Sequence, residues 1–220
     1  MNENDIARSV RIFFAALLFA IPGQVATAAS PTALVEEVSA ARTDVMVMDM
    51  LEPGHVIVLA GGETLTLGYL TSCRQETITG GRITVGRVES TVDGGQVTVK
   101  MVACDSAQTV GSGNEAGAVV FRAPPNDKVA LQAERTVYSL YPILKTDAAV
   151  DTAVLARLDR NEKEISIHLV NGVADLRKLK KKLARNGYYR ISAANRETVF
   201  RVHATAKSSE KALLSRFVAF

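Results

Sequence analysis

The chain has 220 residues, of which 47% are hydrophobic and 22% charged, and its formal net charge is +3. This composition excludes a wholly disordered chain, because enough apolar side chains are present to form a core. Aromatic residues make up only 5% of the chain and Trp is missing, which argues against aromatic carbohydrate-binding platforms and surfaces that stack nucleic-acid bases.

Residues 1–28 have the pattern of a secretory signal peptide. Arg8 and Arg11 precede an uncharged, largely apolar run, and Ala26-Thr27-Ala28 supplies the small-x-small pattern after which signal peptidase cuts. The alternative is an uncleaved membrane anchor, but the apolar run is shorter than the roughly 20 residues that span a bilayer. We therefore expect cleavage near Ala28, a periplasmic or secreted protein, and no transmembrane span in the mature chain.

Residues 29–122 are expected to form the first of two small β domains. Short β-branched runs with a period of two alternate with the glycine pairs Gly61–Gly62, Gly80–Gly81 and Gly94–Gly95. Paired glycines allow a positive φ at both central positions of a tight turn, so they predict hairpins between short strands. About six strands spaced roughly ten residues apart indicate a rolled sheet or a sandwich.

The only two cysteines, Cys73 and Cys104, stand at predicted strand ends within this region. In an exported chain such a pair usually forms a disulfide. A metal site would need more ligands, and the three histidines are scattered and no Cys-x-x-Cys is present. We therefore predict a structural Cys73–Cys104 bond and no metal site.

The stretch Gly111–Gly117 does not fit a phosphate-binding loop. Its spacing is wrong for a dinucleotide loop, it contains no Gly-Lys-Ser/Thr, and the apolar residues 118–121 that follow read as a strand. A hairpin or exposed loop is the better interpretation. Residues 123–127, which include Pro124–Pro125, are expected to be a linker to a second domain over residues 128–220.

The charge balance changes sign at this linker. Residues 29–126 carry 6 Lys/Arg and 11 Asp/Glu, whereas residues 127–220 carry 18 and 10. The mild charge of the whole chain therefore conceals an acidic first half and a basic second half.

The second half is also expected to be mainly β, with one exception. Period-two alternation predicts strands over residues 136–144, 153–158, 165–170, 188–192 and 198–204. Between them, Val173, Leu176, Leu179 and Leu183 fall at helical spacing, and Asn186–Gly187 is a typical helix stop. We therefore predict one short amphipathic helix near residues 173–186.

The polar face of this predicted helix is basic. Its cations are Arg177, Lys178, Lys180, Lys181, Lys182 and Arg185. Such a stripe can bind anionic phospholipid, lipopolysaccharide phosphates or an acidic partner. Two alternatives stay open: a solvated helix face, and docking of the acidic first half on this helix. The export signal argues against nucleic acid as a partner.

The first half resembles two groups of exported proteins. Residues 51–59, Leu-Glu-Pro-Gly-His-Val-Ile-Val-Leu, and the glycine-bounded strands after them resemble the FecR-like periplasmic β domain, which implies a small rolled sheet. Residues 67–86, from Leu-Gly-Tyr-Leu-Thr-Ser-Cys to Ile-Thr-Val-Gly, resemble a group of uncharacterised exported proteobacterial proteins. We expect the chain to lack the cytoplasmic helical region and the true membrane span of a FecR-type regulator.

The second half is similar to the fibronectin-III/immunoglobulin-like modules of envelope proteins. The similar features are Tyr141–Pro142 on a first strand, residues 183–190 with Gly187-Tyr-Tyr-Arg, and the late strand Thr198-Val-Phe-Arg-Val. This resemblance implies a β-sandwich that serves as a spacer or protein-binding unit.

The sequence contains no constellation that predicts catalysis. It has no Gly-x-Ser-x-Gly nucleophile elbow, and His168 and His203 each lie in alternating strand patterns without a supporting partner. We therefore expect a non-enzymatic exported protein, without a cofactor, that binds or scaffolds components of the bacterial envelope. The alternative is a FecR-type sensor or regulatory domain anchored by an uncleaved N-terminal segment.

Overall fold

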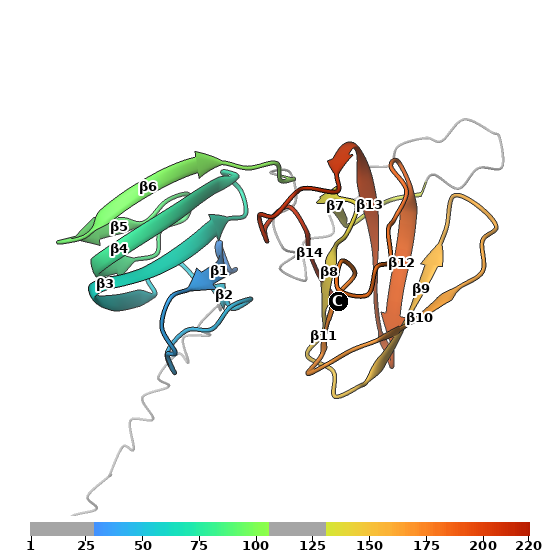
Figure 1. Cartoon of the computed structure of the whole chain (residues 1–220), viewed down its shortest axis with the longest axis horizontal. Coiled ribbons are helices and arrows are strands. Elements are labelled where there is room, and N and C mark those ends of the chain that lie inside the picture. The colour runs from blue at the N-terminus through green and yellow to red at the C-terminus, as the bar shows by residue number, and fades with distance from the viewer. Residues whose placement is uncertain (1–28, 106–130) are drawn as a thin grey trace, which may run out of the picture.

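The computed structural model describes residues 29–105 and 131–220, and it is mainly β, as predicted (Figure 1). The predicted signal peptide, the Gly111–Gly117 stretch and the 123–127 linker lie outside the described residues. Within the described part of the chain, no helix is long and apolar enough to cross a membrane.

The first half forms one six-stranded antiparallel sheet that curls strongly (Figure 1). The strand order is β2-β1-β3-β4, and β5 and β6 follow one another along the free side of β4. The strands are β1 (Ala33–Val38), β2 (Met50–Leu51), β3 (Val56–Tyr69), β4 (Arg74–Thr84), β5 (Thr91–Asp93) and β6 (Gln96–Met101).

The three glycine pairs do not form hairpin turns, so that prediction was wrong. Strands β3 and β4 run straight through Gly61–Gly62 and Gly80–Gly81, and β5 continues into β6 past Gly94–Gly95 without reversing direction. The pairing register places the three pairs side by side across neighbouring strands, where the β3–β4 ladder shifts. The glycines therefore form a line across the sheet at which it bends.

Close approach of the strands explains why this line needs glycine. A Cβ on Gly81 would lie 2.5 Å from the carbonyl oxygen of Asp93 and 2.6 Å from the nitrogen of Gly95, and the φ of Gly81 is +86°. A Cβ on Gly95 would overlap the carbonyl oxygen of Gly80. Both the backbone angle and the missing side chain are therefore required at the bend.

The concave face of the sheet holds the core of the first half. Leu65 and Leu67 of β3 and Ile78 of β4 are fully buried, and Tyr69 bonds to Ser90 through its hydroxyl group at 2.7 Å. The other core residues are Ala33, Val35, Val45, Leu51, Ile57, Leu59, Ile83 and Val85. These side chains alternate along the strands, as the period-two pattern predicted.

The second half contains two sheets that share one hydrophobic core. The larger has the order β10-β9-β12-β13-β7, with β7 parallel to β13, and the smaller has the order β11-β8-β14, with β14 parallel to β8. The strands are β7 (Arg135–Ser139), β8 (Ile143–Lys145), β9 (Thr152–Arg157), β10 (Ile165–His168), β11 (Val173–Asp175), β12 (Tyr188–Ala193), β13 (Arg196–Lys207) and β14 (Phe217–Ala219).

The strand predicted over residues 136–144 is split between the two sheets. Strand β7 belongs to the larger sheet and β8 to the smaller, and Pro142 lies between them. Proline has no N–H to donate to a ladder, so it favours a crossing point over a continuous strand. Strands β9, β10, β12 and β13 confirm the other predicted strands.

The amphipathic helix predicted near residues 173–186 is not formed. Residues 173–175 are strand β11, and the chain then makes a single turn. The N–H of Lys181 donates to the carbonyl of Leu176, and the N–H of Lys180 donates to that of Arg177. Lys180 has a φ of +55°, so this is a Schellman arrangement that ends the turn at once.

Two of the three leucines of the predicted helix are buried without it. Leu176 is fully buried by the turn, and Leu183 is buried in the extended segment after it, where its N–H donates to the carbonyl of Leu140. Leu179, in contrast, is exposed. Helical spacing was misleading because one turn followed by an extended segment also brings Leu176 and Leu183 to the core.

The two halves of the chain meet at a small apolar cluster and a carboxylate. Leu34 of β1 packs with Ile143, Leu213 and Phe217 of the second half. The half-buried carboxylate of Glu36 accepts hydrogen bonds from the N–H groups of Leu213 and Leu214 and from the side chain of Gln75. The Glu36 carboxylate occupies the space that a side chain on Gly68 would fill.

We predict that Gly81→Ala destabilises the protein by at least about 2 kcal/mol, because it combines an unfavourable positive φ with backbone overlap. Gly61→Ala is the matched control: it lies on the same glycine line, but a Cβ there would meet no atom within 4 Å. Urea unfolding of the two variants measures the difference. Equal destabilisation by both would contradict this account of the bend.

A second prediction concerns Glu36. Burial raises the pKa of its carboxyl group above 4.5, because the effect of burial is larger than the opposite effect of the hydrogen bonds that the group accepts. The folded chain therefore holds a proton that the unfolded chain has lost, and stability falls as pH rises from about 4.5 through the raised pKa. This fall should be absent in Glu36→Gln and retained in Glu37→Gln, when urea unfolding is measured across pH. Identical pH profiles for Glu36→Gln and the native chain would contradict the prediction.

Candidate functional site

The basic segment forms an exposed loop between β11 and β12. We call residues 176–182 the lysine loop. The side chains of Lys178, Lys180, Lys181 and Lys182 are exposed, and they make no hydrogen bond or ion pair with any described residue. The predicted cations therefore lie close together, although no helix presents them.

The two arginines of the predicted set have a different role. Arg177 donates hydrogen bonds to the backbone carbonyls of Ser208 and Glu210, and its guanidinium lies 5.8 Å from the ring centroid of Tyr141. Arg185 donates to the carbonyl of Ala206 at 2.9 Å. Both arginines therefore hold the segment on the second half, whereas the four lysines have no partner in residues 29–105 and 131–220.

The start of the lysine loop is fixed by Asp175. Its carboxylate accepts the N–H of Arg177 at 2.9 Å and a guanidinium N–H of Arg216 at 2.6 Å. Burial lowers the pKa of Arg216, and the charge of Asp175 counteracts this effect. The loop is thus tied to the core by a largely shielded ion pair and by the buried side chain of Leu176.

An apolar groove of about 450 Å³ lies next to the lysine loop. Its lining residues are Met48, Ile143, His168, Val170, Val173, Ala174, Asp175, Lys178 and Leu179. Val170 is 64% exposed and Leu179 is 39% exposed, and Lys178 of the lysine loop is also a lining residue. Cationic and apolar groups therefore meet at one exposed edge.

The sequence did not predict the groove, although one signal pointed to its location. Val170-Asn171-Gly172-Val173 is an Asn-Gly hairpin: Asn171 and Gly172 have φ values of +52° and +72°, and Val170 bridges to Val173. Asn-Gly between apolar residues is a strong hairpin signal. The other lining residues come from distant segments, which only the fold brings together.

Docking of the acidic half on the basic segment, one of the alternatives, is not observed in the described residues. The polar contacts between the halves are made by Glu36, by Lys145, which donates to the carbonyl of Met48 at 3.1 Å, and by Ser215, which donates to the carbonyl of Ala103. None of them uses a lysine of the loop. Among the described residues, the loop lysines therefore form no ion pair with a carboxylate of the first half.

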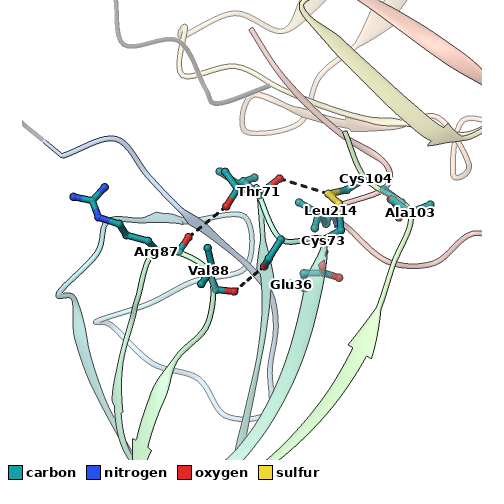
Figure 2. The surroundings of a disulfide bond; sticks show 11 residues. Glu36, Thr71, Cys73, Arg87, Val88, Ala103, Cys104 and Leu214 are labelled. Atoms are coloured by element: carbon teal, nitrogen blue, oxygen red, sulfur yellow. Dashed lines mark hydrogen bonds between the residues drawn. A yellow bond between two sulfur atoms is a disulfide. The ribbon is translucent and has the colours of Figure 1, made fainter. Parts of the chain in front are cut away.

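The predicted disulfide between Cys73 and Cys104 is formed. It joins the turn after β3 to the residues after β6 and closes a loop of 31 residues, which corresponds to about 3–4 kcal/mol through the unfolded state. Figure 2 shows the disulfide beside Leu214 of the second half, close to Glu36. The bond therefore supports the part of the first sheet that receives the second half.

The three histidines lie on different elements. His55 is exposed just before β3, His168 ends β10 on the wall of the groove, and His203 of β13 bonds to Thr205 and lies 4.7 Å from the ring of Tyr138. Among residues 29–105 and 131–220, no group of three or more His, Cys, Asp or Glu side chains is placed to hold a metal ion.

The different roles of the arginines and lysines lead to a stability prediction. Arg177→Gln should destabilise the protein by about 1–2 kcal/mol, because it removes charged donors from two backbone carbonyls. Lys181→Gln removes an exposed charge that has no partner among the described residues, and it should change stability by less than about 0.5 kcal/mol. Urea unfolding at one pH compares them. A larger loss for Lys181→Gln than for Arg177→Gln would contradict these assignments.

Comparison of the chain with protein-family models, with curated proteins and with solved structures gave no match. The surface of the chain itself is therefore the basis for inferring a function. The lysine loop and the groove beside it are the features of that surface that indicate one.

Proposed function

We propose that this chain is a non-enzymatic exported protein that binds the anionic lipid surface of the bacterial envelope through its lysine loop. One observation carries the proposal: four exposed lysines without partners among the described residues lie beside two exposed apolar side chains, Val170 and Leu179. Phosphate headgroups would meet the ammonium groups, while the apolar side chains would enter the boundary between headgroups and acyl chains.

The magnitudes support attachment that is reversible. Each lysine near an anionic surface contributes about 1 kcal/mol, and this contribution is screened by salt. Four lysines and two small apolar side chains correspond to a peripheral contact rather than a permanent anchor. The lysine loop is held by Asp175 and Leu176, so little conformational entropy should be lost on binding.

The fold supports a scaffold that carries this loop. The curled sheet with its line of glycines supports a relation of the first half to the FecR-like type, and the two facing sheets support an immunoglobulin-like spacer in the second half. The Cys73–Cys104 disulfide is compatible with an oxidising compartment such as the periplasm. In this proposal the scaffold positions the loop, and no catalytic step is involved.

Co-sedimentation with vesicles tests the proposal. The purified protein should bind phosphatidylglycerol-containing vesicles at low salt and be released at high salt, and it should not bind pure phosphatidylcholine. Changing Lys180, Lys181 and Lys182 to Gln should weaken binding on the order of 100-fold, since about 1 kcal/mol is lost per lysine. Vesicles that contain lipopolysaccharide form a parallel arm, which shows whether glycolipid phosphates serve equally well.

A matched control removes three charges elsewhere. Lys163, Lys207 and Lys211 are exposed and lie outside the lysine loop, so changing them to Gln lowers the net charge equally and should leave most of the binding intact. Equal losses of vesicle binding in both triple variants would mean that binding depends on the net charge of the protein and not on the lysine loop. No binding to any anionic vesicle would overturn the proposal.

A further inference from the structure

Within the described part of the chain, strand β6 is an open edge of the first sheet. It pairs there with β4 on one side only, and all six of its residues, Gln96–Met101, are exposed. Three of them are apolar: Val97 is 41% exposed, Val99 42% and Met101 65%. Figure 1 shows β6 at the outer border of the sheet. Exposed apolar edge strands are sites at which another strand can add.

The backbone of β6 is oriented for such an addition. The N–H of Val102 donates to the carbonyl of Cys73 on the β4 side. Because backbone groups alternate along a strand, those of residues 98 and 100 also face β4, and those of Val97, Val99 and Met101 face outward. Three consecutive pairs of donors and acceptors are therefore directed toward solvent.

The side chains of the same three residues lie on the face of the sheet that carries the core. Val97 lies opposite Ile78 in the register, and Ile78 lies opposite Leu65, both fully buried. Val99 and Met101 lie opposite Glu76 and Arg74, which form an ion pair. The apolar face therefore reaches β6 at Val97, and no strand among the described residues covers the three side chains.

The edge is held in strand geometry at both ends. At one end the disulfide joins Cys104 to Cys73, and Ala103 accepts a hydrogen bond from Ser215 of the second half. At the other end lies the glycine line, where Gly95 packs against the backbone of Gly80. The strand is therefore prepared for pairing without further ordering.

We propose that β6 pairs with β6 of a second copy of this chain, antiparallel about a two-fold axis. In the register that places Val99 opposite Val99 of the second copy, Val97 lies opposite Met101 and Lys100 lies opposite Thr98. Every apolar side chain of the edge then has an apolar partner, and no two like charges face each other directly. The two curled sheets would join into one continuous sheet.

The composition of the edge favours a second copy over an unrelated strand. Lys100 is the only charged residue of β6, so the edge offers little charge to select a different partner. It is self-complementary when antiparallel, because its apolar residues occupy alternate positions symmetrically about Val99. A two-fold interface requires such self-complementarity.

Sedimentation equilibrium of the native protein over a concentration series tests the pairing. The native chain should form dimers, and Val99→Lys should raise the dimer dissociation constant at least about 10-fold, because it places two ammonium groups opposite each other across the axis. Val88→Lys is the matched control: Val88 is 51% exposed outside any strand, and the variant should dimerise like the native chain.

A charge-swap experiment tests the register and also shows that the variants still fold. Val99→Lys and Val99→Glu should each be impaired alone, and an equimolar mixture should restore a dimer in which the two opposite charges face each other. A native chain that stays monomeric would overturn the proposal. A strand of another protein would then be the remaining partner for the β6 edge. Dimers that are insensitive to Val99→Lys would also overturn it.

Discussion

A carboxylate placed over a glycine joins the two halves of this chain. Glu36 lies at the irregular position of β1, where the pairing register with β3 shifts, and its carboxylate fits because Gly68 carries no side chain. From there it accepts the N–H groups of Leu213 and Leu214. The apolar cluster of Leu34, Ile143, Leu213 and Phe217 then closes around this contact. Together with the hydrogen bonds of Lys145 and Ser215, these contacts hold the second half on the first sheet.

The curl of the first sheet depends on glycines, which carry no side chain, at the bend. Glycines stand at the level of the bend in β3, in β4 and between β5 and β6, and the backbones approach too closely there for a Cβ at Gly81 or Gly95. The bend lets the sheet enclose its own core, and the sheet ends at β6, whose six residues are exposed. The glycine line therefore explains both the enclosed core and the exposed apolar edge.

The sequence predicted the features that depend on local pattern. Period-two alternation indicated the strands, and two cysteines in a chain predicted to be exported indicated the Cys73–Cys104 bond. It was misleading where one pattern fits two structures. Gly61–Gly62 allows a turn or a bend, and the spacing of Leu176 and Leu183 fits a helix or a turn followed by an extended segment. Contacts between residues far apart in the sequence decide which of the two structures forms. One of them is the hydrogen bond from the N–H of Leu183 to the carbonyl of Leu140.

The candidate site was predicted only in part, for the same reason. The basic residues 177–185 were visible in the sequence, but only the fold separates Arg177, held by the carbonyls of Ser208 and Glu210, from the lysines, which have no partner in the part of the chain that the structure describes. The groove combines Met48 with Ile143 and Val173, segments that no local pattern relates.

The contact between Glu36 and Leu213 spans 177 residues of sequence. Chain emerging in order, whether from a ribosome or from a translocation channel, can complete the first sheet long before its partner residues arrive. The joint between the halves must therefore close late, and during that interval the surface around Leu34 is uncovered. Contacts of such high sequence separation slow folding and expose apolar surface in the meantime. The order of the chain thus makes docking of the two halves the last step in reaching the native state.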